Sequence, residues 1–350
     1  MKKEVKRLCG LILAAVLLMG AAGCGGGGNT AATDTTAATA AETGFIVTDQ
    51  AGREVFFEKP AEKIVSSYYI STAILAALGI EENIAGIEMK ADTRGLYKAA
   101  APGFLELPAV GSGKGINIEE TAALSPDVVI IPQKLADSAE QFEKLSIPVI
   151  VVDPETMDNF KECIALLGQV CGAEERADAL IGYYEEKMAF AEELTGSLED
   201  RPKVYLAAGS SYLSTCTSKM YQNDLIRMAG GENVSAELQE GYWQEISPEQ
   251  LLQWDPDYIF AVGYAEYTLD DIRNDARLSE VNAVKSGNIY TFPSALEPWD
   301  YPTPSSVLGI LWLTHALHPE LYSEADYMKE AEAFYRTFFD IGVSAAELGV

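Results

Sequence analysis

Few residues in this chain have types and spacings that suit catalysis or metal binding. The two histidines, His315 and His318, lie three apart near the end of an apolar helical pattern, and two imidazoles alone are a weak zinc signal. The G-x-S-x-G turn of many hydrolases does not occur. A hydrolase with a Ser-His-Asp triad is therefore an alternative that no sequence motif supports. The glycine-rich stretch 111–115 lacks the spacing of an ATP-binding P-loop. It predicts a turn whose backbone N–H groups could face a ligand.

The strongest candidates for ligand contact are aromatic and basic residues at the ends of predicted strands. In parallel α/β units, ligands bind beyond the carboxyl ends of the strands. Tyr and Trp give rigid contact area with a polar tip, and Arg94 and Lys114 could pair with an anionic ligand. The predicted ligand-binding residues are Tyr68, Tyr69, Arg94, Lys114, Gln133, Tyr212, Trp243, Tyr264, Trp299 and Tyr301. For Tyr68, Trp243 and Trp299 the alternative is packing within a lobe.

These strand ends belong to a supersecondary unit that occurs twice in the sequence. Residues 117–130 align without a gap to residues 247–260, at an offset of 130 residues. Each copy has a helix-capping residue, a Glu two positions later, an apolar helical turn, Pro-Asp and an apolar strand. The flanking segments that also match are 63–69 with 203–212, and 147–153 with 287–293. The repetition predicts two α/β lobes rather than one long sheet.

Other patterns assign the elements around the repeats. Alternating apolar residues on both sides of Gly52 predict a β-hairpin over 45–58. A helix follows over 71–80, for which we expect Ser71 or Thr72 to be the cap.

A helical pattern joins the two halves. Apolar residues recur at three- and four-residue spacing from about residue 157 to 199, and Gly172 is expected to interrupt the pattern before a second helix from about Glu174. We expect this segment to bridge an N-terminal lobe over 44–156 and a C-terminal lobe over 200–350. The alternative is a helical hairpin within one domain.

The N-terminus is predicted to be an export signal rather than part of the fold. Residues 1–23 combine a basic start with a short apolar stretch, and small residues precede Cys24 as in the lipobox of bacterial lipoproteins. Cleavage would leave Cys24 lipidated at the start of a flexible tether over 24–43, which has no large apolar residue. The alternative is an ordinary secretory signal.

The net charge of the chain argues against one class of partner. The 350 residues carry a net charge of −28, and loss of the predicted signal makes it −31, which disfavours nucleic-acid partners.

Cys163 and Cys171 are eight apart on a predicted helix, about 12 Å, which is too far for a disulfide. A bridge from Cys216 to either stays open, but we expect buried free thiols.

Taken in order, several segments resemble the substrate-binding lipoproteins of bacterial ABC importers for iron–siderophore, haem and cobalamin. The matching segments are Thr48–Val55, Pro60–Ser66, Leu75–Gly79, both Pro-Asp repeats, Ala283–Tyr290 and Leu317–Glu320. The resemblance implies two Rossmann-like α/β lobes bridged by one long helix, with the ligand cleft between them and no catalytic activity. It also implies that His318 ends a helix, and that Glu119 and Glu249 dock onto arginines of the permease.

The resemblance implies a function outside the cytoplasm. The expected protein is a monomer held to the cell membrane only by its lipid anchor, with no resident cofactor or metal. It would capture a metal chelate of ferric-siderophore, haem or cobalamin type and deliver it to an ABC permease with its ATPase subunits. The alternatives are a molybdate-type oxyanion binder of the same fold and a two-lobed secreted hydrolase.

Overall fold

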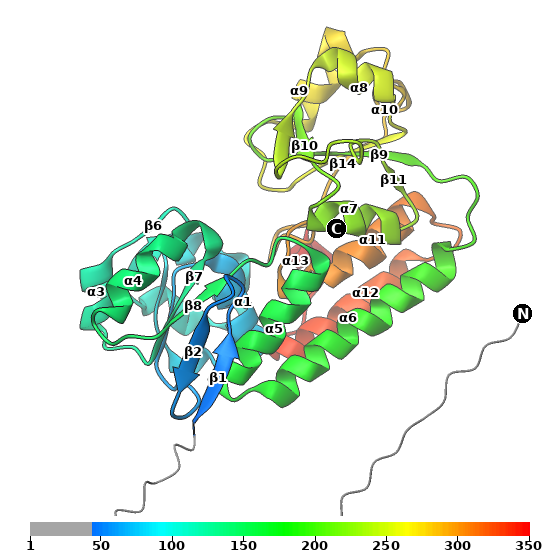
Figure 1. The fold of residues 1–350 in the computed structure, drawn as a ribbon. Coiled ribbons are helices and arrows are strands. Elements are labelled where there is room, and N and C mark those ends of the chain that lie inside the picture. The colour runs from blue at the N-terminus through cyan, green and yellow to red at the C-terminus, as the bar shows by residue number, and fades with distance from the viewer. Residues whose placement is uncertain (1–43) are drawn as a thin grey trace, which may run out of the picture. The chain divides into compact units, whose positions relative to one another are not determined.

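The computed structural model describes residues 44–350, so the predicted signal, Cys24 and the tether lie outside the described residues. After the antiparallel hairpin of β1 (Phe45–Thr48) and β2 (Glu54–Phe57), the chain forms two separate sheets (Figure 1). The prediction of two α/β lobes is confirmed. Within the described residues, no helix is long and apolar enough to cross a membrane.

The N-lobe contains a mostly parallel sheet in the order β6-β5-β4-β3-β7-β8. Its strands are β3 (Ile64–Ser66), β4 (Ile84–Glu88), β5 (Ala109–Ser112), β6 (Gly115–Ile116), β7 (Val128–Pro132) and β8 (Val149–Val152). Its helices are α1 (Tyr69–Ala77), α2 (Gly95–Ala100), α3 (Ile118–Ala123) and α4 (Ala139–Glu143).

The C-lobe sheet runs β12-β10-β9-β13-β14, with β11 also paired to β9. Its strands are β9 (Lys203–Ala207), β10 (Ser214–Cys216), β11 (Glu232–Asn233), β12 (Trp243–Glu245), β13 (Tyr258–Ala261) and β14 (Ile289–Thr291). The helices after α6 are α7 (Tyr221–Met228), α8 (Pro248–Trp254), α9 (Leu269–Arg273), α10 (Asn282–Ser286), α11 (Val307–Leu317), α12 (Glu324–Phe339) and α13 (Ala345–Leu348).

The sequence repeat is also a repeat of backbone conformation. Asn117 and Ser247 cap α3 and α8 through their side chains, each accepting a hydrogen bond from the backbone N–H three residues later. Both helices are followed by a non-glycine residue in the left-handed region, Ser125 at φ 50° and Asp255 at φ 47°. Because few residues other than glycine adopt this conformation, its occurrence at matched positions supports a common plan.

The aspartate of each Pro-Asp pair ties two parallel strands together. Asp127 donates its backbone N–H to Lys63 O and accepts the Lys63 N–H through its carboxylate. Asp257 makes the same two bonds with Lys203 in the other lobe. The residues that follow then pair in register, β7 with β3 and β13 with β9. These aspartates therefore align strands rather than bind ligand.

The segment between the lobes consists of two helices, α5 (Met157–Cys171) and α6 (Glu174–Thr195). Gly172 ends α5 in the left-handed conformation at φ 69°, which confirms the predicted interruption. Helix α5 packs against α1 of the N-lobe, whereas α6, about 33 Å long, lies beside α11 and α7 (Figure 1). The 22-residue α6 is thus the long element of the bridge.

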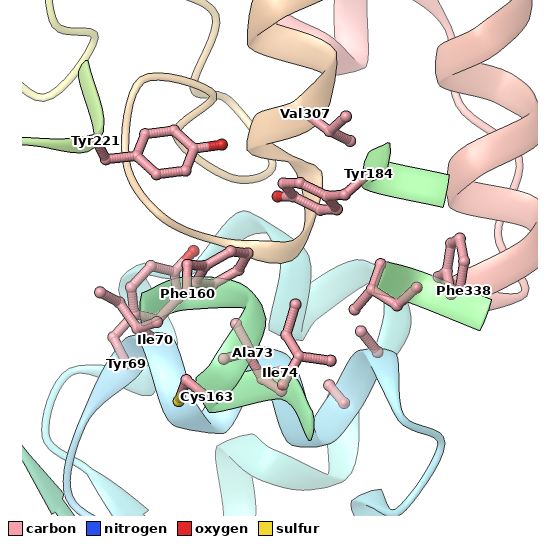
Figure 2. Close-up of a cluster of buried hydrophobic side chains, with 14 of the residues drawn as sticks. Tyr69, Ile70, Ala73, Ile74, Phe160, Cys163, Tyr184, Tyr221, Val307 and Phe338 are labelled. Carbon is pink, nitrogen blue, oxygen red and sulfur yellow. The ribbon is translucent and has the colours of Figure 1, made fainter. Parts of the chain in front are cut away.

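A single apolar core runs through this bridge. Phe160 of α5 lies with its ring centroid 5.5 Å from Tyr184 of α6 and 6.1 Å from Tyr221 of α7. Figure 2 shows these rings between α1, which contributes Ile70, and α11, which contributes Val307. All five residues have no exposed surface. The lobes therefore share buried surface and are not joined only by flexible strands.

One expectation for α1 is wrong. Ser71 and Thr72 lie inside the helix, and its first turn begins after Tyr68 without a side-chain cap. Ser71 instead donates to Tyr68 O, and Thr72 donates to Glu88 Oε2 at 2.7 Å. Their hydroxyls satisfy buried polar groups, which is a stronger requirement in an interior than capping an exposed helix end.

Truncating the shared core should destabilise both lobes at once. We expect Phe160→Ala to lower the free energy of unfolding by about 3–5 kcal/mol, because it removes a fully buried ring. Thermal and urea unfolding followed by circular dichroism should show one transition at a lower midpoint. The matched control is Phe56→Ala in the hairpin, where the side chain is 43% exposed and the expected loss is below about 1 kcal/mol. Two separate transitions in either variant would contradict a shared core.

Candidate functional site

A cavity of about 660 Å³ lies where the N-lobe strand ends face loops of the C-lobe. On the N-lobe side it is lined by Tyr68, Tyr69, Glu88, Met89, Lys90, Arg94, Ser112, Gly113, Lys114, Pro132, Gln133, Lys134, Val152, Asp153, Pro154 and Glu155. On the C-lobe side it is lined by Tyr242, Tyr264, Pro298 and Tyr301. The N-lobe residues follow β3, β4, β5, β7 and β8, so the rule that parallel sheets bind at their carboxyl ends locates this cavity.

Most of the residues predicted to contact a ligand meet at this cavity. They are Tyr68, Tyr69, Arg94, Lys114, Gln133, Tyr264 and Tyr301. The Tyr264 and Tyr301 rings contact edge to face at a centroid distance of 6.3 Å. Together with Tyr68 they give the cavity an aromatic wall with hydroxyl groups.

Two predicted tryptophans do not reach the cavity. Trp299 is 1% exposed, and its indole N–H donates to the Tyr335 hydroxyl at 3.2 Å in the shared core. Trp243 starts β12 and packs against the same core, while the preceding Tyr242 lines the cavity. For Trp299 the alternative of packing within the protein describes its position, because a large indole surface gains most from full burial. Trp243 is half-buried where it packs against the core.

Tyr212 also lies away from this cavity. Its hydroxyl donates to Asp275 at 3.1 Å and accepts from Arg277 at 3.3 Å. These three residues line a smaller hollow of about 420 Å³ in the C-lobe. The β9–β10 loop that carries Tyr212 turns its side chain toward α9 rather than toward the N-lobe.

Residues 153–155, which follow β8, also line the cavity and are not among the ligand contacts predicted from the sequence. The sequence pattern predicts a strand at 147–153, but none of the predicted ligand-binding residues comes from its carboxyl end. Applying the same rule to this strand would have identified Asp153 and Glu155. Burial raises the pKa of both carboxyls, and the nearby Asp153 raises that of Glu155 further, while Lys134 acts in the opposite direction.

Four basic side chains surround the cavity, those of Lys90, Arg94, Lys114 and Lys134. None of them forms an ion pair within 4 Å in the part of the chain that the structure describes. Lys90 has a left-handed backbone at φ 68°, a conformation that costs energy for a residue with a side chain. Lys59 and Lys144, by contrast, pair with carboxylates on the outer surface, so what distinguishes the four is that they lie together around one cavity.

Arg94 has the most constrained position of the four. Its guanidinium carbon lies 3.8 Å from the centroid of the Tyr69 ring, a favourable cation–π distance. The Arg94 Nε atom is buried and has no hydrogen-bond acceptor among the described residues. Because a buried donor without a partner is costly, the guanidinium is ready to donate to an acceptor that enters the cavity.

Three carboxyls behind the cavity wall are almost fully buried. Glu88 accepts from the Tyr97 hydroxyl at 2.7 Å, and burial raises its pKa. Burial also raises the pKa of Glu297 to about 7 and that of Asp300 to about 7. Asp300 accepts from the Tyr264 hydroxyl at 2.9 Å. Glu297 and Asp300 hold Tyr69 and Tyr264 of the site in place from behind the cavity wall. Glu88 itself lines the cavity.

The residues with metal-binding or nucleophilic potential lie elsewhere. His315 Nδ1 pairs with Tyr322 O at 2.8 Å and His318 Nε2 with Gly230 O at 3.3 Å, and His318 follows the last residue of α11. The described residues contain no group of three or more metal-ligating side chains. Cys163, Cys171 and Cys216 are buried free thiols, as predicted. Burial raises the pKa of Cys216 to about 11, so it stays protonated.

The residues predicted to dock a permease are Glu119 and Glu249, and both are exposed in the first turns of α3 and α8. A hydrogen bond at its own backbone, with help from Ser247, lowers the pKa of Glu249, so this carboxylate is charged at neutral pH. The two side chains occupy equivalent positions in the two lobes.

Comparison with known proteins identifies the family and the fold. The family described as "Periplasmic binding protein" matches residues 64–296. The chain is 25% identical over 320 residues to the molybdate-binding protein MolA of Haemophilus influenzae, covering 84% of this chain and 90% of that protein. It is 25% identical over 259 residues to the petrobactin-binding protein YclQ of Bacillus subtilis, covering 71% and 78%.

Solved structures agree with these matches. A periplasmic solute-binding protein from Veillonella parvula superposes with a TM-score of 0.75 at 27% identity, covering 87% of this chain and 96% of that one. The relatives are solute-binding proteins of transport systems rather than enzymes. The two relatives named by ligand bind different classes of molecule, so similarity alone leaves the ligand open.

The buried acids predict how stability depends on pH. Because the pKa of Glu297 is raised from 4.5 to about 7 in the folded state, its contribution to stability is full below pH 4.5 and is lost as the pH rises through 7. We expect Glu297→Gln to flatten the decline of the melting temperature between pH 5 and pH 8. The control is Glu119→Gln, an exposed carboxyl. Parallel curves for wild type and Glu297→Gln would show that Glu297 does not titrate in this range.

Proposed function

Since the chain belongs to the periplasmic binding protein family, we propose that it captures an anionic metal chelate of the siderophore type outside the cytoplasm and delivers it to an ABC permease. The family works with a permease and its ATPase subunits. A lipid on Cys24 would hold the protein at the membrane, and the 24–43 tether would give it reach. We expect the binding protein to act as a monomer without catalytic activity.

The observation that carries this proposal is the unpartnered Arg94 guanidinium at the cavity. With Lys90 and Lys114 it makes one side of the cavity basic, although the whole chain has a net charge of −28. The buried Arg94 Nε–H has no acceptor among the described residues, and a buried charged donor without an acceptor is costly unless a ligand compensates it. The ligand should therefore present carboxylate, catecholate or similar oxygen acceptors to this side.

The size of the cavity and its aromatic wall favour a chelate over a small ion. The volume of about 660 Å³ lies in the usual range for sites that bind organic molecules, about 300–1,000 Å³. Tyr68, Tyr264 and Tyr301 offer ring faces to a bulky ligand. The acidic residues Asp153 and Glu155 on the other side could accept hydrogen bonds from amide or ammonium groups of such a ligand.

A molybdate-type oxyanion is the second candidate. The similarity to MolA favours it, and Arg94 and Lys114 provide donors of the right charge. A small tetrahedral anion would leave most of the cavity of about 660 Å³ unfilled, which is why the chelate is the first candidate. A hydrolase is disfavoured because both histidines pair with backbone carbonyls away from the cavity.

Removing the charge of Arg94 should weaken binding of anionic ligands selectively. We expect Arg94→Met to lower the affinity for a ferric tris-catecholate by about tenfold to 100-fold, the loss of one or two charge-assisted hydrogen bonds. Intrinsic fluorescence titration of wild type with ferric siderophores, haem, cobalamin and molybdate identifies the ligand class first. The matched control is Lys144→Met, a basic residue already paired with Glu140 on the outer surface. Tight binding of molybdate alone would replace the chelate proposal with the second candidate.

The exposed glutamates should matter for delivery but not for capture. We expect Glu119→Ala combined with Glu249→Ala to leave ligand affinity unchanged and to abolish uptake, because these carboxylates would pair with permease arginines. Uptake of the radiolabelled metal chelate by cells lacking the native protein measures this. Glu120→Ala is the control, since Glu120 lies next to Glu119 and is equally exposed. Loss of affinity in the double variant would reject the docking role.

A further inference from the structure

Tyr69, the ring beneath Arg94, is held by the opposite lobe. Tyr69 is the first residue of α1 in the N-lobe and is 7% exposed. Its hydroxyl donates to Glu297 Oε1 at 3.4 Å. Glu297 lies in the loop between β14 and α11 of the C-lobe and is 1% exposed. The other carboxylate oxygen, Oε2, accepts from the Ser305 backbone N–H at 3.0 Å and from the Ser305 hydroxyl, which fixes Glu297 to the start of α11.

The backbone next to Arg94 is held by the same C-lobe loop. Leu96, two residues after Arg94, donates its N–H to Leu296 O at 2.9 Å. Gly95 approaches the loop so closely that an added Cβ atom would lie 2.2 Å from Ala295 O. A residue with a side chain cannot occupy this position without moving α2 away. The two contacts lie on either side of the Arg94 side chain, one at its backbone and one beneath its guanidinium.

We propose that the C-lobe segment Ala295–Glu297 positions Arg94 for the ligand, so that the geometry of the N-lobe arginine is set by the opposite lobe. The inference rests on the proposed function, in which Arg94 binds the anionic part of the ligand. Glu297 acts through Tyr69, and Leu296 acts through the start of α2. Neither Glu297 nor Leu296 lines the cavity, so both are positioning residues.

The arrangement has a physical advantage for binding. Arg94 has no ion pair in the described part of the chain to hold its side chain, and an unrestrained arginine loses rotamer entropy when it binds. Stacking on a ring that is itself hydrogen-bonded restricts the guanidinium before the ligand arrives. Ligand affinity should then depend on the contacts of Tyr69 with Glu297 and of Leu96 with Leu296, although the ligand touches neither Glu297 nor Leu296.

A ligand-independent experiment tests the positioning. In ¹H–¹⁵N spectra the Nε–H signal of Arg94 is identified by its loss in Arg94→Lys. We expect Tyr69→Phe, which keeps the ring and removes only the hydroxyl, to speed solvent exchange of this Nε–H by about threefold to tenfold, the equivalent of one hydrogen bond. Gly95→Ala should have the same effect by displacing α2. The matched controls are Tyr183→Phe, whose hydroxyl bonds to Glu330, and Gly103→Ala, where an added Cβ meets no atom within 4 Å.

A double-mutant cycle then separates positioning from general stability. Using a ferric tris-catecholate as probe, we expect Tyr69→Phe to weaken binding by about threefold to tenfold in wild type and not at all in the Arg94→Met background. Unchanged exchange of the Arg94 signal in folded Tyr69→Phe, or equal losses in both backgrounds, would overturn the proposal. If no probe binds, the exchange measurement still decides the positioning, and only the proposed function fails.

Discussion

The fold depends most on the burial of one continuous apolar core between the two lobes. Phe160, Tyr184 and Tyr221 come from three helices and make contact where neither lobe could bury them alone. The Tyr184 hydroxyl also donates to Thr303 O at 2.7 Å, which fixes the loop that leads into α11. With this surface buried, the lobes cannot separate widely without exposing it to water. The cavity is therefore a largely preformed site whose width is limited by the bridge.

The repeated unit explains why the cavity lies where it does. In each lobe the Pro-Asp turn starts a strand beside its parallel neighbour, so β7 and β13 have equivalent places in their sheets. The five parallel N-lobe strands, β3, β4, β5, β7 and β8, end toward the cavity, and the C-lobe contributes Tyr242, Tyr264, Pro298 and Tyr301 from its loops. The repeated unit thus forms part of the scaffold in both lobes, whereas the charged residues that line the cavity all come from the N-lobe.

Much of this architecture could be predicted from the sequence because it follows from local patterns. The sequence repeat at an offset of 130 residues predicted two lobes, and the helical pattern interrupted at Gly172 predicted the bridge between them. The rule that ligands bind at the carboxyl ends of parallel strands predicted a cavity that includes Arg94 and Tyr301. The errors concern tertiary packing. Trp299 is as aromatic as Tyr301, and only the contact with Tyr335 places it in the core. The bond between Tyr69 and Glu297 joins residues 228 positions apart, and no sequence pattern indicates it.

The basic side of the cavity, in a protein of net charge −28, affects how quickly an anion can enter. Far from the cavity an anion is repelled by the net negative charge of the protein. Only near Arg94 and the lysines does attraction by these cations exceed that repulsion. Dissolved salt screens the long-range repulsion more than the short contacts inside the cavity, since the Debye length is about 8 Å at physiological ionic strength. The association rate constant for an anionic chelate should therefore rise when salt is added, which is opposite to the behaviour of proteins that attract their ligands by a complementary net charge.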